Sequence, residues 1–213
     1  MGTTFKELKR RTFLGMSRTD GEAVLAVEQG INDAVQIFAQ MESFDEMLTV
    51  DTTSADTVDG TKSYHLITAW GLTRPKNILT LRIEDTSLST KLTYLPMAEF
   101  DKKFPYPETY SEDRPTIYTR RGMSVELFRI PDAAYDVHVV YNQFPAELTA
   151  DTDECVLLNF DAQITFLAKD IANAYLSGNY SDFQTRAREI LRAGISGRRD
   201  RPDHILVAKP FIA

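Results

Sequence analysis

The side chains best suited to chemistry are three histidines and one cysteine. His65 and His138 each stand inside a stretch of alternating apolar and polar residues, and His204 lies near the C-terminus. Metal sites usually need two or three ligands at short spacings such as HxxxH or CxxC, and no pair of these histidines has one. We therefore interpret His65 and His138 as structural residues within strands, and we expect no metal site.

Cys155 is the single cysteine, which excludes an internal disulfide and a thiolate metal cluster and favours a reducing, cytosolic origin. It directly follows Asp151-Thr152-Asp153-Glu154, in which Asp151 and Glu154 have the spacing of a capping box, so a helix is predicted to begin there. A helix N-terminus can lower a thiol pKa. Apolar residues follow Cys155 and no histidine is near, so a small buried hydrophobe is the better interpretation.

The common catalytic motifs are absent from the sequence. GxSxG, GxxxxGK[ST] and GxGxxG do not occur, and the acidic turn at 151–154 is too short for an EF-hand ligand series. We expect no cofactor and no enzymatic activity.

Charge is unevenly distributed along the 213 residues, whose net charge is −7. That balance argues against a nucleic-acid binder by bulk electrostatics. Residues 42–59 carry only acidic charges, whereas residues 6–18 and 186–201 are mainly basic. No apolar run approaches the roughly 18 residues that a membrane helix needs, and the N-terminus has no secretion signal, so no membrane contact is expected.

The arginines near the C-terminus have two interpretations. They could be the solvated end of a helix, where cations suit the dipole. Alternatively, they and the residues after them dock onto a partner, which the apolar segment Ile205-Leu206-Val207 and Phe211-Ile212 favours, because a free disordered end is normally polar.

Hydrophobic periodicity predicts helices at both ends of the chain. Residues 3–16 and the stretch after Thr19-Asp20-Gly21, up to Met41, show the helical pattern, with Gly30 marking a close packing contact. A helix starting at Asp151 is apolar over an unusually wide surface, and a last helix is predicted over Ser181–Arg192.

Between these helices the period changes to two. A hairpin is predicted from Met47 with its turn at Asp59-Gly60, and a second strand pair around Thr86-Ser87. A short helix following Pro96 and three more strands complete this region.

The predicted fold class is α+β. A helical bundle is built from N- and C-terminal helices and carries an inserted antiparallel β-domain and an extended C-terminal tail. The expected boundaries are 1–46 for the N-terminal helices, 47–143 for the β-domain, 144–193 for the C-terminal helices and 194–213 for the tail.

This order of elements resembles the head-to-tail adaptor, or connector, proteins of tailed bacteriophages, in the type with a β-domain inserted in the helical core. The resemblance covers about residues 20 to 205. It rests on the INDAVQIFAQ and FLAKDIANAYL helices and on the string that closes the β-domain. The residues that carry this string are Pro115, Tyr118, Pro131, Tyr135, Tyr141, Pro145, Leu148 and 151–153.

The resemblance implies a structural protein of the virion neck, made in the cytoplasm of the bacterial host. Copies would form a ring, usually of twelve, between the portal protein and the tail or nozzle proteins. The ring would continue a DNA channel without sequence specificity.

The resemblance also implies roles for particular residues. The C-terminal segment would bind the portal through Arg198, Arg199, Arg201, Ile205, Leu206, Val207, Lys209 and Phe211. The wide apolar helix would contact a neighbouring subunit through Val156, Leu158, Phe166 and Ala172. Arg186, Arg188 and Arg192 would line the DNA channel.

Two other kinds of function stay open from the sequence. A tail-side gatekeeper or terminator would bind tail proteins and not the portal. A small enzyme or carbohydrate-binding module would use aromatic residues for stacking, namely Trp70, Tyr106, Tyr110 and Tyr118.

Overall fold

The computed structural model describes residues 2–54, 56–85, 88–157, 160–178 and 183–196. The chain divides into two compact units, a helical unit built from Met1–Glu46 and Pro145–Ala213 and a β unit built from Met47–Phe144. Each has its own core, and each is treated separately below.

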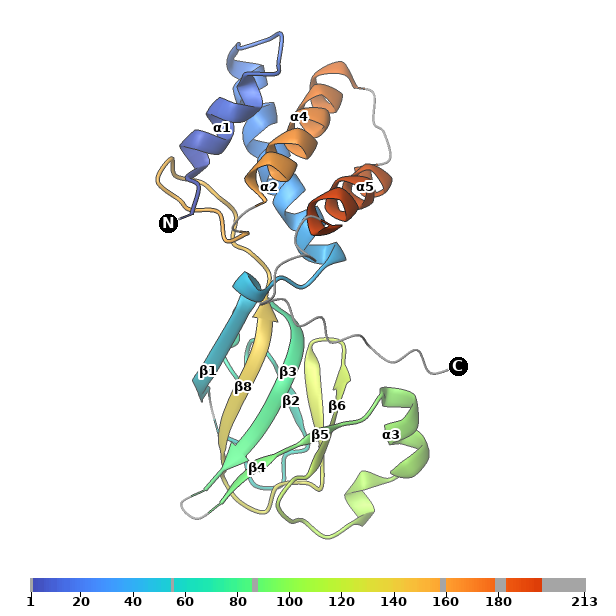
Figure 1. Ribbon diagram of the computed structural model, residues 1–213. Helices are drawn as coiled ribbons and strands as arrows, with labels where there is room; N and C mark the ends of the chain where they lie inside the picture. The colour runs from blue at the N-terminus through green and yellow to red at the C-terminus, as the bar shows by residue number, and fades with distance from the viewer. Residues whose placement is uncertain (1, 55, 86–87, 158–159, 179–182, 197–213) are drawn as a thin grey trace. The chain divides into compact units, whose positions relative to one another are not determined.

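The helical unit contains four of the helices drawn in Figure 1. They are α1 (Phe5–Phe13), α2 (Gly21–Met41), α4 (Asp161–Ser177) and α5 (Phe183–Ser196). The Thr4 hydroxyl caps α1 by accepting from the Glu7 amide, and the Asp20 carboxylate caps α2 by accepting from the Ala23 amide. Threonine and aspartate are both among the residues preferred at the N-cap of a helix.

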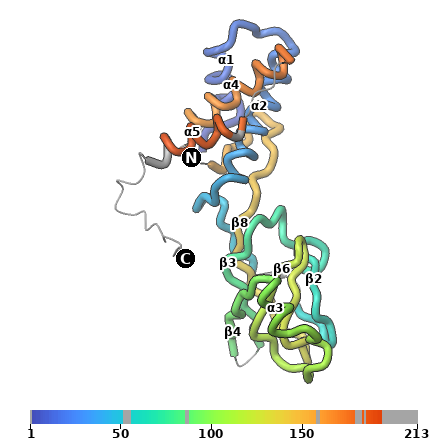
Figure 2. Tube along the Cα trace, turned by 90° about the vertical axis from the view of Figure 1, so that its right-hand side faces the viewer, coloured from blue at the N-terminus to red at the C-terminus, as the bar shows by residue number. Residues whose placement is uncertain are grey.

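Helices α1, α2 and α4 lie side by side in both views (Figures 1 and 2). The core of the unit comes from one apolar stripe of each helix, including Leu8, Ile31, Phe38 and Ile164, all fully buried. Gly30 lies where α2 meets α4, and a Cβ there would be 2.7 Å from the Ala168 carbonyl oxygen. The predicted close contact at Gly30 is confirmed.

The β unit consists of two four-stranded sheets with the orders β1-β8-β3-β4 and β2-β7-β6-β5. Its strands are β1 (Leu48–Ser54), β2 (Ser63–His65), β3 (Pro75–Glu84), β4 (Ser89–Lys91), β5 (Thr93–Tyr94), β6 (Ile117–Arg121), β7 (Ser124–Phe128) and β8 (Asp136–Gln143). All pairs are antiparallel except β5 with β6, which is parallel. Helix α3 (Met97–Lys103) follows β5, as the sequence predicts.

Inward-facing residues of both sheets share one core. Leu81, Val137 and Val139 from the first sheet pack in the same cluster as Val125 and Leu127 from the second. Alternation along the strands produces this burial, because successive side chains point to opposite faces. The predicted α+β class is confirmed, the strand pair predicted around Thr86-Ser87 is β3 with β4, and the three further strands predicted after it are β6, β7 and β8.

The predicted hairpin from Met47 is wrong. Asp59 and Gly60 do form a turn, with Gly60 at a φ of 71°. The strands on either side of it belong to different sheets, however, since β1 pairs with β8 and β2 pairs with β7. The Asp59-Gly60 pair therefore predicts a turn correctly, but it does not determine which strands pair with each other.

The helix predicted to start at Asp151 begins ten residues later, at Asp161. Residues 151–157 form a turn and irregular structure, and Asp153 caps this turn by accepting from the Thr149 and Ala150 amides. Cys155 and Leu157 are buried without being helical, and the Phe160 ring packs edge-on against Phe44 at 4.8 Å between centroids. The apolar residues Cys155, Leu157 and Phe160 therefore reflect burial of irregular structure and not the buried face of a helix.

Candidate interaction surfaces

His65 and His138 take structural positions. The His138 Nε2 lies 3.2 Å from a Glu84 carboxylate oxygen on the neighbouring strand, and the His65 Nδ1 accepts from the Thr68 amide. Among the described residues, no three His, Cys, Asp or Glu side chains group in a way that could hold a metal ion. His204 lies outside the described residues.

Cys155 is a buried residue of the helical unit, as expected, although it stands in the turn before α4. Burial raises the pKa of its thiol to about 11. A thiol in this state is a poor nucleophile at neutral pH, because the thiolate is the reactive form.

The N-terminal segment holds the turn that contains Cys155. The Phe5 amide donates to the Asp153 carbonyl at 2.8 Å, and the Cys155 amide donates to the Thr3 carbonyl at 3.0 Å. The Thr3 hydroxyl also donates to Asp161 in the first turn of α4. Segments about 150 residues apart in sequence are thus joined at this place.

Lys9 adds two ion pairs to the same region. Its Nζ lies 2.9 Å from Glu28 in α2 and 2.7 Å from Asp151, and only 18% of its side chain is exposed. Burial lowers the pKa of Lys9, but hydrogen bonds to Asp151 and Glu28 outweigh this and raise it overall. Helix α1 therefore positions the turn before α4 through charge and backbone contacts together.

The α4–α5 face carries the most exposed large apolar residue of α4. Phe166 is 50% exposed, and the Arg186 guanidinium carbon lies 5.2 Å from the centroid of its ring. Arg186 also contacts Asp170 at 3.5 Å and Glu189 at 3.2 Å. An exposed aromatic ring with an arginine beside it is typical of a protein contact surface, where both residue types are enriched.

The residues expected at a subunit interface separate into three groups. Phe166 and Val156 are exposed, and Ala172 is fully buried inside the helical unit beside Gly30, so it is not available to a partner. Leu158 lies outside the described residues. Of the arginines expected at a channel, Arg188 and Arg192 are exposed on α5, and Arg186 is engaged as described above.

The residues expected to bind the portal all lie outside the described residues. These are Arg198, Arg199, Arg201, Ile205, Leu206, Val207, Lys209 and Phe211.

The aromatic residues considered for sugar stacking divide by burial. Trp70 and Tyr118 are buried in the β-unit core, which removes both rings from any ligand surface, whereas Tyr106 and Tyr110 are exposed. The Tyr110 ring contacts Phe128 and Phe104, so it packs locally.

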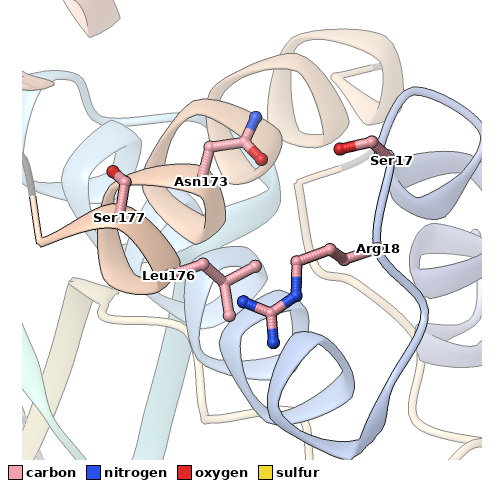
Figure 3. A pocket seen from close by; sticks show the side chains of 5 residues that line it. All are labelled: Ser17, Arg18, Asn173, Leu176 and Ser177. Carbon is pink, nitrogen blue, oxygen red and sulfur yellow. The ribbon is translucent and has the colours of Figure 1, made fainter.

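A shallow hollow of about 280 Å³ opens between the α1–α2 connection and the end of α4 (Figure 3). Its lining residues are Ser17, Arg18, Asn173, Leu176 and Ser177. Arg18 Nη2 is paired with Asp20 at 2.7 Å and with Glu22 at 3.1 Å. The hollow is small and has a mixed polar and apolar lining, below the size usual for a cofactor site. No sequence pattern marks it.

No helix in the described ranges combines the length and the apolar character needed to cross a membrane.

A comparison with protein families gives one match over nearly the whole sequence. The family model described as "SU10 adaptor protein" matches residues 3–206. No curated protein matches the chain. The matched range includes both compact units and α1, which lies before the part of the sequence that first showed a resemblance.

Proposed function

The chain belongs to the SU10 adaptor protein family, and from this premise we propose that it is a ring-forming head-to-tail adaptor that joins the portal to the tail. Membership makes it a phage structural adaptor, a virion component that contacts other head or tail proteins. The ring, the portal contact and the DNA channel are our proposal.

The observation that carries the proposal is the length of the family match. Residues 3–206 span the helical unit, the inserted β unit and most of the C-terminal segment, so the match concerns the whole architecture and not one motif. Exposed Phe166 on α4 supports a protein contact at the α4–α5 face, where we place the neighbouring subunit. Exposed Arg188 and Arg192 on α5 support a surface that faces DNA, by electrostatics without base readout.

Sedimentation of the full-length protein, alone and mixed with the portal protein of the same virus, tests the proposal. We expect a stoichiometric complex with the portal. Two separate peaks would contradict a portal adaptor and would favour a tail-side gatekeeper or terminator.

The docking element is tested by alanine variants of the tail. Phe211→Ala and Ile205→Ala should weaken the portal complex, because apolar anchors carry much of the affinity at protein interfaces. Leu25→Ala, which changes an exposed leucine of α2, is the matched control and should leave binding unchanged. An unchanged affinity for both tail variants would overturn the tail assignment and leave the neck assignment to the portal experiment.

A further inference from the structure

Strand β1 is an outermost strand of its sheet and pairs with β8 on one side (Figure 1). An edge strand offers a row of backbone N–H and C=O groups to which another extended segment can add. Natural edges are usually protected by lysine, proline or a bulge. Leu48–Asp51 contains neither lysine nor proline, and its pairing with β8 is regular, since the irregularity comes after Asp51.

The outer face of β1 is apolar and exposed. Leu48 is 49% and Val50 62% exposed. Val50 stands opposite the half-buried Val140 of β8, and Leu79 of β3 is 51% exposed. An apolar strip therefore runs to the edge of the sheet, where an added strand would extend it.

Beyond the C-terminal end of β1 the surface becomes acidic. The Thr57 amide donates to the Tyr135 carbonyl and the Gly60 amide to the Pro131 carbonyl, both at 2.9 Å, so residues 56–60 run beside residues 131–136. Neither range contains a lysine or an arginine. Together they expose four carboxylates, which we call the acidic end of the β1 edge: Asp56, Asp59, Asp132 and Asp136.

Two basic side chains near the acidic end are already engaged elsewhere, and Lys62 is one of them, with its Nζ 3.5 Å from both Glu108 and Glu126. The Arg114 guanidinium carbon lies 5.1 Å from the centroid of the Tyr135 ring, but Arg114 is hydrogen-bonded to Asp85 and to the Ile83 carbonyl. The acidic end thus has a net negative charge that a basic segment would complement.

The C-terminal sequence has the pattern that fits this edge in an antiparallel direction. Three arginines at 198, 199 and 201 come first and outnumber the two aspartates, Asp200 and Asp203, among them; Pro202 and His204 also precede the β-prone run Ile205-Leu206-Val207. Arg201 stands five residues before Leu206, and Asp56 stands six residues after Val50. At about 3.4 Å per residue in an extended chain, an antiparallel strand with Leu206 near Val50 brings its arginines to the acidic end.

We propose that, in the protein free of other virion components, residues 198–207 of one copy pair antiparallel with β1 of a second copy. The choice of a second copy rests on the proposed function, which places copies side by side. The same segment cannot occupy the edge and the portal at once, so portal binding would release β1. The edge strand then holds the docking segment until its final partner is present.

Cysteine cross-linking of the full-length protein tests this pairing without the portal. One preparation carries Val50→Cys and a tag, and three untagged preparations carry Ile205→Cys, Leu206→Cys or Val207→Cys. Each mixture is oxidised, and the tagged–untagged heterodimer is measured on a non-reducing gel. Directly opposite side chains in adjacent antiparallel strands are within disulfide range, and successive side chains point to opposite faces.

We expect the heterodimer yield to alternate, so that position 206 differs severalfold from positions 205 and 207. The unmodified chain should form no dimer, because its only cysteine is buried. Leu25→Cys, in α2 and 67% exposed, replaces Val50→Cys in the matched control and should give no alternation.

Three results would overturn the proposal. They are equal yields at all three positions, a yield no higher than that of the Leu25→Cys control, and a cross-link within one chain in a Val50→Cys and Leu206→Cys double variant. These results do not depend on the portal, so they are separate from a failure of the proposed function, which is measured by portal sedimentation.

Discussion

Gly30 shows at the residue scale how closely α2 and α4 approach. A methyl group at this position would lie 2.7 Å from the Ala168 carbonyl oxygen and 3.3 Å from the Ala172 amide nitrogen, and both atoms are backbone. Backbone cannot move aside as a flexible side chain can. Glycine destabilises a helix relative to alanine, but only glycine leaves room for α4 to pack this closely against α2.

We predict that Gly30→Ala destabilises the protein. Overpacking costs about 1–3 kcal/mol, which outweighs the roughly 1 kcal/mol that alanine gains in helix propensity. Urea unfolding gives the change in the free energy of unfolding. Gly21→Ala is the matched control, because a Cβ there has nothing within 4 Å and it should be neutral or stabilising. If both variants behaved alike, the close contact would not be limiting.

Glu7 makes the stability of α1 depend on pH. Hydrogen bonds from Arg10 and Arg11 lower the pKa of its carboxyl to about 2. Because the folded-state pKa lies below the ordinary value, the stabilisation is fully present above about pH 4.5 and is lost as the pH falls toward 2.

We predict that Glu7→Gln lowers the free energy of unfolding at pH 7 and that the difference from the unmodified protein shrinks below about pH 4.5. Urea titrations at several pH values between 7 and 3 measure this. Glu147→Gln removes one exposed negative charge elsewhere in the helical unit and serves as the control. A difference that stayed constant over the whole range would contradict the assigned pairing of Glu7.

At the scale of elements, the N-terminal segment holds the turn at 151–155 through backbone hydrogen bonds. Removal of Gly2-Thr3-Thr4 takes away the carbonyl that accepts from the Cys155 amide, and it takes away the cap of α1. We predict much faster hydrogen exchange at the Cys155 amide and a loss of about 1 kcal/mol from the cap. NMR-detected hydrogen exchange measures the rate at the Cys155 amide and, as a reference, at the Ile164 amide. The Ile164 amide, which donates to the Phe160 carbonyl at the start of α4, should keep its protection, and unchanged exchange at Cys155 would refute the role of the segment.

The elements that the sequence predicted correctly are those whose signals are local. The Asp20 cap and the periodic apolar stripe define α2, and alternation defines β6, β7 and β8. The errors arise from contacts distant in sequence. The partner of β1 is β8, and the apolar residues before Asp161 are buried by the N-terminal segment and by Phe44, which no local pattern encodes.

The candidate surfaces were predictable to a smaller extent for the same reason. Phe166 and Ala172 look equivalent in the sequence as members of a wide apolar face. Only the packing of α2 against α4 shows that Ala172 is internal and Phe166 exposed. The sequence did not reveal the β1 edge, because the predicted hairpin paired β1 with β2, whereas β1 pairs with β8 in the other sheet.

At the scale of the whole molecule, the chain leaves the helical unit and returns to it at neighbouring points of one sheet. Leu48, at the start of β1, stands opposite Asn142, near the end of β8. An insertion whose two ends are adjacent disturbs its host little, because the connections need not span a distance. The β unit also encloses its own core from both sheets.

We therefore predict that the fragment of residues 47–144 folds without the helical unit. Its urea unfolding should be a single cooperative transition, since small domains with one core usually unfold in this way. The same experiment on Leu81→Ala should lower the free energy of unfolding by about 2–5 kcal/mol, because Leu81 is fully buried in that core. Leu79→Ala, two residues along the same strand but half-exposed, should change it far less. A fragment that unfolds gradually would mean that the helical unit contributes to the β-unit core, and the insertion would then be structurally dependent on its host.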